Sequence, residues 1–208
     1  MTSSMPLFGA ANAWITPPIA VSVLALLFTV ASFWWIQVRR GRLRSFGPSA
    51  YAASYGKDKT LVNLPLVIHN TGPAPLAVIN ARLRLRPANM ADGSGEIVLY
   101  WHALRTAIYT DAANGGRTFA SPFAVEGRKS VEKYLEFQRN VPNSQLAAVP
   151  YRATVDVRVE PSARPSRWVK LVRFTLHAEL ITEAREPFLQ RSNDPDLMGE
   201  KSQTWVQG

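Results

Sequence analysis

The sequence predicts an all-β protein with one membrane anchor: a single N-terminal transmembrane helix followed by an antiparallel β-sandwich of about seven strands. Two observations lead to this fold class. The first 38 of the 208 residues contain no Asp, Glu, Lys or Arg. Beyond them, short apolar runs alternate with turn residues at the spacing of strands, and no further long helix is indicated. Such a succession of short strands is typical of a sandwich.

Composition already excludes several classes of protein. Hydrophobic residues make up 47% of the chain and charged residues 19%, so the chain can bury a core and is not disordered throughout. It contains no cysteine, which excludes disulfides, a thiol nucleophile and cysteine-ligated metals. The net charge of +9 is partly explained by four arginines at the end of the apolar segment.

The predicted transmembrane helix spans residues 17–38. It is preceded by a short N-terminus of residues 1–16. Over residues 19–38, a helix would be about 30 Å long, which matches the hydrocarbon core of a bilayer. Proline at positions 17 and 18 suits a helix start. Its few polar side chains can bond to the helix backbone; they are Ser22, Thr29, Ser32 and Gln37.

Both ends of this helix carry residues typical of a membrane interface. Tryptophan is favoured where lipid meets water, and four arginines follow the apolar segment directly. A buried helix of a soluble protein and a cleaved signal peptide are the alternatives. A signal peptide has its positive charges before the apolar segment, which favours a retained anchor here. The predicted interface residues are Trp14, Trp34, Trp35, Arg39, Arg40, Arg42 and Arg44.

The positive-inside rule then predicts a single-pass protein of the cell membrane with the bulk of the chain in the cytoplasm. The arginines can also attract anionic lipid headgroups. Residues 39–59 are predicted to be a basic juxtamembrane segment and stalk, although residues 45–60 also suit a first irregular strand. Residues 60–185 are predicted to be the sandwich and 186–208 a flexible polar tail. The predicted strands are 61–70, 76–86, 96–105, 118–125, 131–138, 151–160 and 168–180.

Three segments of this soluble part resemble the immunoglobulin-like and fibronectin-III-like superfamily: LPLVIHNTGPAPL, FAVEGRKSVEKYLEF and YRATVDVRVE. Tyr151, at the start of the last segment, stands where such folds have a tyrosine corner; alternatively it is only an aromatic strand residue. The superfamily's cysteine pair is absent. The resemblance implies a binding module that uses strand edges or end loops.

No motif of a catalytic, metal or cofactor site is found. His69, His102 and His177 fall on three different predicted strands without ligand spacing. The carboxylate pairs at 132 and 136 and at 179 and 183 are interpreted as solvated surface. We therefore expect neither an enzyme, nor a metal, nor a cofactor.

Arg82, Arg84 and Arg86 are the most distinctive feature of the soluble part. In a strand these arginines lie on one face about 7 Å apart, opposite Ala81, Leu83 and Leu85. Arg158 or Arg173 could extend this patch from a neighbouring strand. The patch is either an ordinary solvated face paired with acids or a binding surface for anionic lipid or an acidic partner protein. Nucleic acid is disfavoured, because no aromatic residue is expected on that face.

Together these patterns predict a membrane-anchored interaction or scaffolding protein that presents its β-sandwich at the cytoplasmic face. The first alternative is an exported envelope or adhesion protein with the same sandwich outside. The second is an unrecognised hydrolase. The expected partners are the lipid bilayer and an unidentified protein.

Overall fold

A computed structural model describes residues 17–38, 41–55, 59–89, 95–108, 116–140, 146–147, 149–160, 167–178 and 189–194. The chain divides into two compact units, residues 1–40 and residues 41–208. Each unit is described by itself below.

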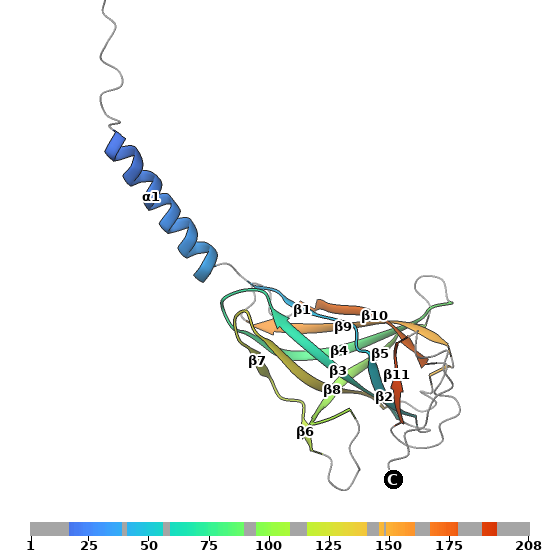
Figure 1. Cartoon of the computed structure of the whole chain (residues 1–208). Helices are drawn as coiled ribbons and strands as arrows, with labels where there is room; N and C mark the ends of the chain where they lie inside the picture. Colours follow the sequence, from blue (N-terminus) through green and yellow to red (C-terminus); the bar gives the residue numbers. More distant parts are fainter. Residues whose placement is uncertain are drawn as a thin grey trace, which may run out of the picture. The chain divides into compact units, whose positions relative to one another are not determined.

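The first unit contains the apolar helix. Helix α1 (Pro17–Phe33) continues into a short π-helix, η1 (Trp34–Val38) (Figure 1). The Ser22 and Thr29 hydroxyls donate to carbonyl oxygens four residues earlier, at 2.8 Å each, as predicted. No residue of α1 is buried, and Pro17–Gln37 is long and apolar enough to cross a membrane. Among the residues that the structure describes, there is therefore one candidate transmembrane helix, and it lies at the predicted place.

The second unit is an antiparallel β-domain. Its strands form one hydrogen-bonded sheet with the order β10-β9-β4-β5-β8-β3-β2-β11; in addition β1 pairs with β3, β6 with β5 and β7 with β4. The strands are β1 (Leu43–Ser45), β2 (Ala50–Tyr55), β3 (Thr60–Asn70), β4 (Leu76–Pro87), β5 (Ile97–Arg105), β6 (Arg117–Phe119), β7 (Phe123–Val125), β8 (Ser130–Arg139), β9 (Pro150–Glu160), β10 (Val169–His177) and β11 (Leu189–Ser192).

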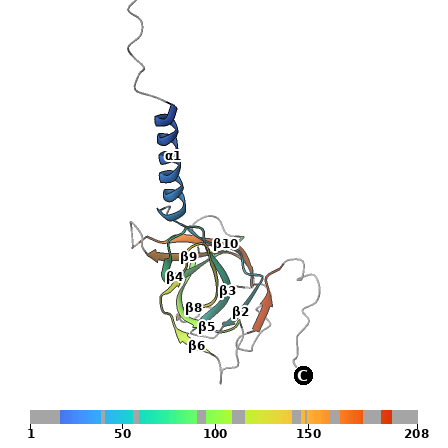
Figure 2. The same cartoon turned by 60° about the vertical axis from the view of Figure 1, so that its left-hand side comes forward.

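This architecture confirms the antiparallel all-β class but not the division into two sheets. Figure 2 shows the strands curling around a common interior like part of a barrel. Where the burial alternates along a strand, every second side chain fills that interior, because successive side chains of a strand point to opposite faces. On β4, for example, Ala81, Leu83 and Leu85 are fully buried while the intervening arginines are partly exposed. The predicted alternation of this strand is confirmed.

The structure differs from the expected elements in three places. For residues 45–60 a stalk or a first irregular strand was expected; β1 and β2 lie within residues 39–59, and Tyr51 is fully buried. The single strand expected at 118–125 is divided into β6, which pairs with β5, and β7, which pairs with β4. The tail expected to be flexible contributes β11, which pairs with β2.

Side chains join the two ends of the curled sheet, where no ladder of backbone hydrogen bonds links β10 to β2 or β11. The Tyr51 hydroxyl on β2 donates to the carbonyl oxygen of His177 on β10 at 2.6 Å. Asn193, directly after β11, donates to the carbonyl oxygens of Pro48 at 3.1 Å and Thr175 at 2.8 Å. Its side-chain oxygen accepts from the His177 backbone N–H at 3.1 Å. The first and last parts of the domain are thereby tied to β10.

Candidate functional site: the arginine face

The outer face of β4, β9 and β10 carries a regular array of basic side chains, here called the arginine face. Strand β9 lies in the middle, and the pairing register sets outward side chains of β4 and β10 on either side of it. Three rows result: Arg82, Asp156 and Lys170; Arg84, Thr154 and Arg173; Arg86, Arg152 and Thr175.

The first row contains an acidic side chain, Asp156, which binds two arginines. Arg82 Nε donates to Asp156 Oδ2 at 3.0 Å, and Arg84 Nε donates to the same oxygen at 2.7 Å. Arg84 Nη2 also donates to Oδ1 at 3.2 Å, which makes the Arg84 contact bidentate. These hydrogen bonds raise the pKa of the Arg84 guanidinium. Because the two arginines cover it, Asp156 is only 2% exposed, although it lies on the outer face of β9.

An aromatic ring also belongs to this face, contrary to the sequence-based expectation. The guanidinium carbons of Arg82 and Arg158 lie 4.4 Å and 4.6 Å from the centre of the Trp168 ring, within the range of cation–π attraction. The register of β10 against β9 shifts between Lys170 and Val172. Such a bulge inserts one extra residue into the strand and reverses the alternation beyond it. A strict alternation along the strand therefore places Trp168 on the inner face with Val172, whereas the bulge places it on the arginine face.

The second and third rows enclose a cavity of about 270 Å³, here called the arginine pocket. Its acidic side chain is Glu96, which lies 3.1 Å from Arg84 and 3.8 Å from Arg86. Arg86 and Arg152 are direct cross-strand partners. Two like charges in such positions repel each other and destabilise the sheet. The pocket is lined by Arg84, Arg86, Glu96, Arg152, Thr154 and Arg173.

Two arginines of the pocket remain uncompensated. Within the part of the chain that the structure describes, neither Arg152 nor Arg173 forms an ion pair, and both are exposed. Asp156 therefore offsets part of the positive charge at one end of the arginine face, while the pocket end keeps the larger excess. The prediction that Arg173 extends the patch is confirmed, and so is its extension by Arg158.

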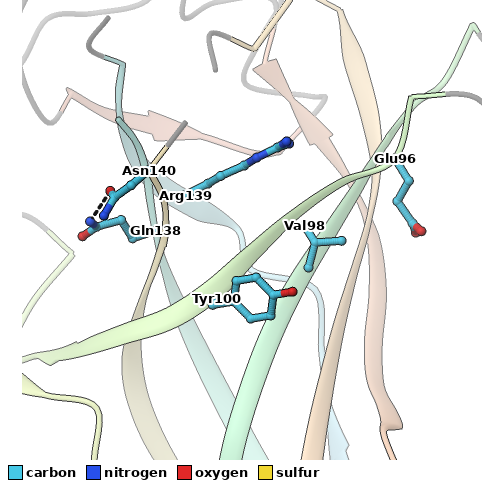
Figure 3. Close-up of a pocket in the computed structure, with 6 residues that line it drawn as sticks. All are labelled: Glu96, Val98, Tyr100, Gln138, Arg139 and Asn140. Atoms are coloured by element: carbon cyan, nitrogen blue, oxygen red, sulfur yellow. Dashed lines mark hydrogen bonds between the residues drawn. The ribbon is translucent and has the colours of Figure 1, made fainter. Parts of the chain in front are cut away.

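A second, open hollow of about 430 Å³ adjoins the pocket, because Glu96 lines both. Figure 3 shows the Tyr100 ring beside Val98 on β5, with Gln138, Arg139 and Asn140 across the hollow. Tyr100 is 61% exposed, so its ring is available for contact. The Gln138 amide donates a hydrogen bond to Asn140 Oδ1. Aromatic and amide groups thus lie next to a cationic pocket.

Glu136 contradicts the interpretation of the carboxylate pairs as solvated surface. It is fully buried and accepts hydrogen bonds from Arg105 Nε and Arg117 Nη2, both at 2.5 Å. These contacts tie β8 to β5 and β6. Glu132, by contrast, is exposed and accepts from the Tyr134 hydroxyl at 2.9 Å, which raises the pKa of Tyr134. Residues 179 and 183 lie outside the described residues.

The predicted interface residues are divided between the two units. Trp34 and Trp35 lie on η1 and are more than half exposed. Arg42 and Arg44 are exposed on either side of the buried Leu43, at the start of the β-domain. Trp14, Arg39 and Arg40 lie outside the described residues.

The remaining candidates have local roles. The His69 ring Nδ1 lies 3.1 Å from Ser130 Oγ, and no group of three metal-ligating side chains is found among the described residues. Tyr151 is 1% exposed, and its hydroxyl accepts from the Ala147 backbone N–H at 2.9 Å. Burial raises the pKa of Tyr151.

Comparison with known proteins gives no family. No protein-family model and no curated protein matches the chain. A crystal structure of a protein from Archaeoglobus fulgidus is 9% identical with a TM-score of 0.36, covering 72% of this chain and 98% of its own. A solution structure described as a late embryogenesis abundant (LEA) protein is 8% identical with a TM-score of 0.35, covering 84% and 93%. Likeness at this level carries no argument about function.

Proposed function

We propose that this protein is a single-pass membrane-anchored interaction protein whose β-domain faces the cytoplasm and binds an acidic partner protein through the arginine face. The observation that carries the proposal is the uneven compensation of charge on that face. The three rows and Glu96 contain five arginines and one lysine against two carboxylates. Such an excess on a rigid sheet attracts acidic partners and speeds their encounter.

On the solvent-exposed face of an ordinary sheet, acidic side chains would be distributed among the basic ones. Here Asp156 lies at one end, held by Arg82 and Arg84, and Glu96 faces Arg84 and Arg86. Arg152 and Arg173 therefore point their charge at solvent. Because arginine binds carboxylates in a two-pronged geometry, these two side chains are the most available for a partner.

The choice of variants follows from these contacts. Replacing Arg82 or Arg84 would leave the buried Asp156 with reduced compensation, which costs stability irrespective of binding. The double variant Arg152→Gln with Arg173→Gln removes charge without touching Asp156. Each of the two single variants, Arg152→Gln and Arg173→Gln, has a matched control in Lys170→Gln, because it removes one charge from the same face outside the pocket.

Binding can be measured with the full chain in a non-ionic detergent and a fluorescent pool of Glu-rich peptides. We expect binding that weakens as salt is raised. The Arg152 and Arg173 double variant should weaken it at least about tenfold, equivalent to about 1.4 kcal/mol, whereas Lys170→Gln should change it less than about threefold. Equal binding by all three proteins would contradict the proposal that the pocket end of this face binds the partner.

Orientation has a direct test because the chain contains no cysteine. Single-cysteine variants Ser3→Cys and Ser202→Cys can be treated in intact cells with a membrane-impermeant maleimide. We expect labelling at position 3 in intact cells and at position 202 only after permeabilisation, since the arginines after the helix favour the cytoplasmic side. The opposite pattern would support the exported alternative.

The immunoglobulin-like sandwich is part of the same proposal. The contact between the Tyr151 hydroxyl and the backbone of Ala147, four residues upstream, supports it, because a tyrosine corner makes a contact of this kind.

A further inference from the structure

We propose that the arginine pocket recognises a phosphorylated side chain, a phosphoserine or phosphothreonine of the partner, rather than a carboxylate. This inference rests on the proposed binding function of the arginine face and names the group that the face recognises. It is carried by the charge, the chemistry and the surroundings of the pocket.

The charge balance favours a dianion. Two carboxylates, those of Asp156 and Glu96, compensate only part of the positive charge of the arginines in the three rows. These arginines are Arg82, Arg84, Arg86, Arg152 and Arg173. A glutamate from a partner would bring one negative charge, whereas a phosphoserine brings about −1.5 to −2 at neutral pH. The phosphate therefore compensates much more of the excess, and it relieves the cross-strand pair formed by Arg86 and Arg152.

The chemistry of the lining also matches a phosphate. Arg152 and Arg173 provide donors from two neighbouring strands, so that they approach a group in the pocket from different directions. Thr154 lies between Arg84 and Arg173 in the second row and adds a hydroxyl at the wall of the pocket. Clusters of arginine are a recurrent means of binding phosphorylated residues, because guanidinium donors fit the phosphate oxygens.

The size and neighbourhood of the pocket favour a phosphorylated protein over a lipid. At about 270 Å³, the pocket lies just below the usual range for small-molecule sites and suits one charged group. The hollow beside it offers the Tyr100 ring and the amides of Gln138 and Asn140 (Figure 3). Such groups can hydrogen-bond to a peptide backbone and pack against its side chains, whereas acyl chains need apolar surface.

The experiment compares three degenerate peptide pools that differ only in the central residue: phosphoserine, glutamate or serine. Binding to the full chain in non-ionic detergent is followed by fluorescence anisotropy. We expect the phosphoserine pool to bind at least about tenfold more tightly than the glutamate pool. The Arg152→Gln variant should lose this preference, and Lys170→Gln should keep it.

Thermal unfolding tests whether the Arg152→Gln variant remains folded. Without ligand we expect an unchanged or higher melting temperature, because the substitution removes one member of a like-charged pair. A phosphoserine peptide should raise the melting temperature of the unaltered chain and not that of the variant. A marked drop in the unliganded variant would show that Arg152 has a structural role and would overturn its assignment to recognition.

The outcomes separate this inference from the proposed function. Equal binding of the phosphoserine and glutamate pools through Arg152 would overturn the phosphate inference and leave the acidic-partner proposal intact. Absence of binding by both acidic pools would contradict both. Micelles doped with phosphatidic acid that compete for Arg152 as strongly as the phosphoserine pool would assign the pocket to a lipid headgroup and overturn the inference.

Discussion

Replacing Asn193 with Ala is predicted to weaken the whole β-domain, although this residue lies in a segment that the sequence marks as a tail. The Asn193 side chain makes three hydrogen bonds to backbone groups, at 3.1, 2.8 and 3.1 Å. At about 1 kcal/mol for each, the substitution should cost about 3 kcal/mol. The backbone bond from Asn193 N–H to Ser49 O at 2.7 Å is retained in the variant, so the loss reports the side chain alone.

The assay is thermal unfolding of the full chain in non-ionic detergent, followed by tryptophan fluorescence. For a domain of this length, 1 kcal/mol corresponds to roughly 2–4 °C, so the melting temperature should fall by roughly 6–12 °C. The control Ser192→Ala removes only the hydrogen bond that Asp194 N–H donates to the Ser192 hydroxyl and should lower it far less. A decrease below 3 °C for Asn193→Ala would refute the view that this side chain joins the ends of the sheet.

Further predictions concern the buried ion pair, a buried phenol and a tight turn. Glu136→Gln should cost about 3–5 kcal/mol in denaturant unfolding, because it removes the buried negative charge that holds the arginines at positions 105 and 117. Burial raises the pKa of Tyr151 above its ordinary value of 10, so the stability that the neutral phenol contributes is complete below pH 10 and is lost as pH rises through the higher folded value. Unfolding measured across pH 9–12 should therefore show a steeper alkaline loss of stability in the unaltered chain than in Tyr151→Phe; equal slopes would contradict this. Gly127→Ala should cost about 1–3 kcal/mol, since its Cβ would lie 1.7 Å from the Pro73 carbonyl oxygen; Gly47→Ala, where the nearest contact is 3.1 Å, is the milder comparison.

The predicted strands agree best with the structure where the period of two is strict. Strand β4 alternates apolar and basic residues along its second half, and each of those side chains lies on the predicted face. The apolar helix was equally clear, because its uncharged segment is long enough to span lipid. In both cases the pattern follows from local geometry alone.

The sequence-based predictions fail where contacts between distant parts of the chain determine the structure. Strand β11 is only four residues long and takes its place by pairing with β2, more than 130 residues earlier. The burial of Asp156 and Glu136 depends on arginines from other strands, which no local pattern reveals. The bulge in β10 moved Trp168 to the arginine face, because one inserted residue reverses the alternation of a strand.

The site was therefore predicted in part. The three arginines of β4 and their extension from neighbouring strands followed from alternation. The cross-strand register that sets Arg152 opposite Arg86, and thus creates the pocket, could not be derived without knowing which strands pair. The sequence contains Thr154 and Arg152, but it does not show that they lie at the centres of the second and third rows, because this depends on the register.

The most direct test of the account is extraction of membranes containing the full-length chain with alkaline carbonate, followed by intact-mass measurement of the protein that remains. A helix that spans lipid predicts a chain that resists carbonate, is released by detergent and retains residues 1–40. Release into the carbonate supernatant, or a mature chain that lacks those residues, would contradict the membrane anchor.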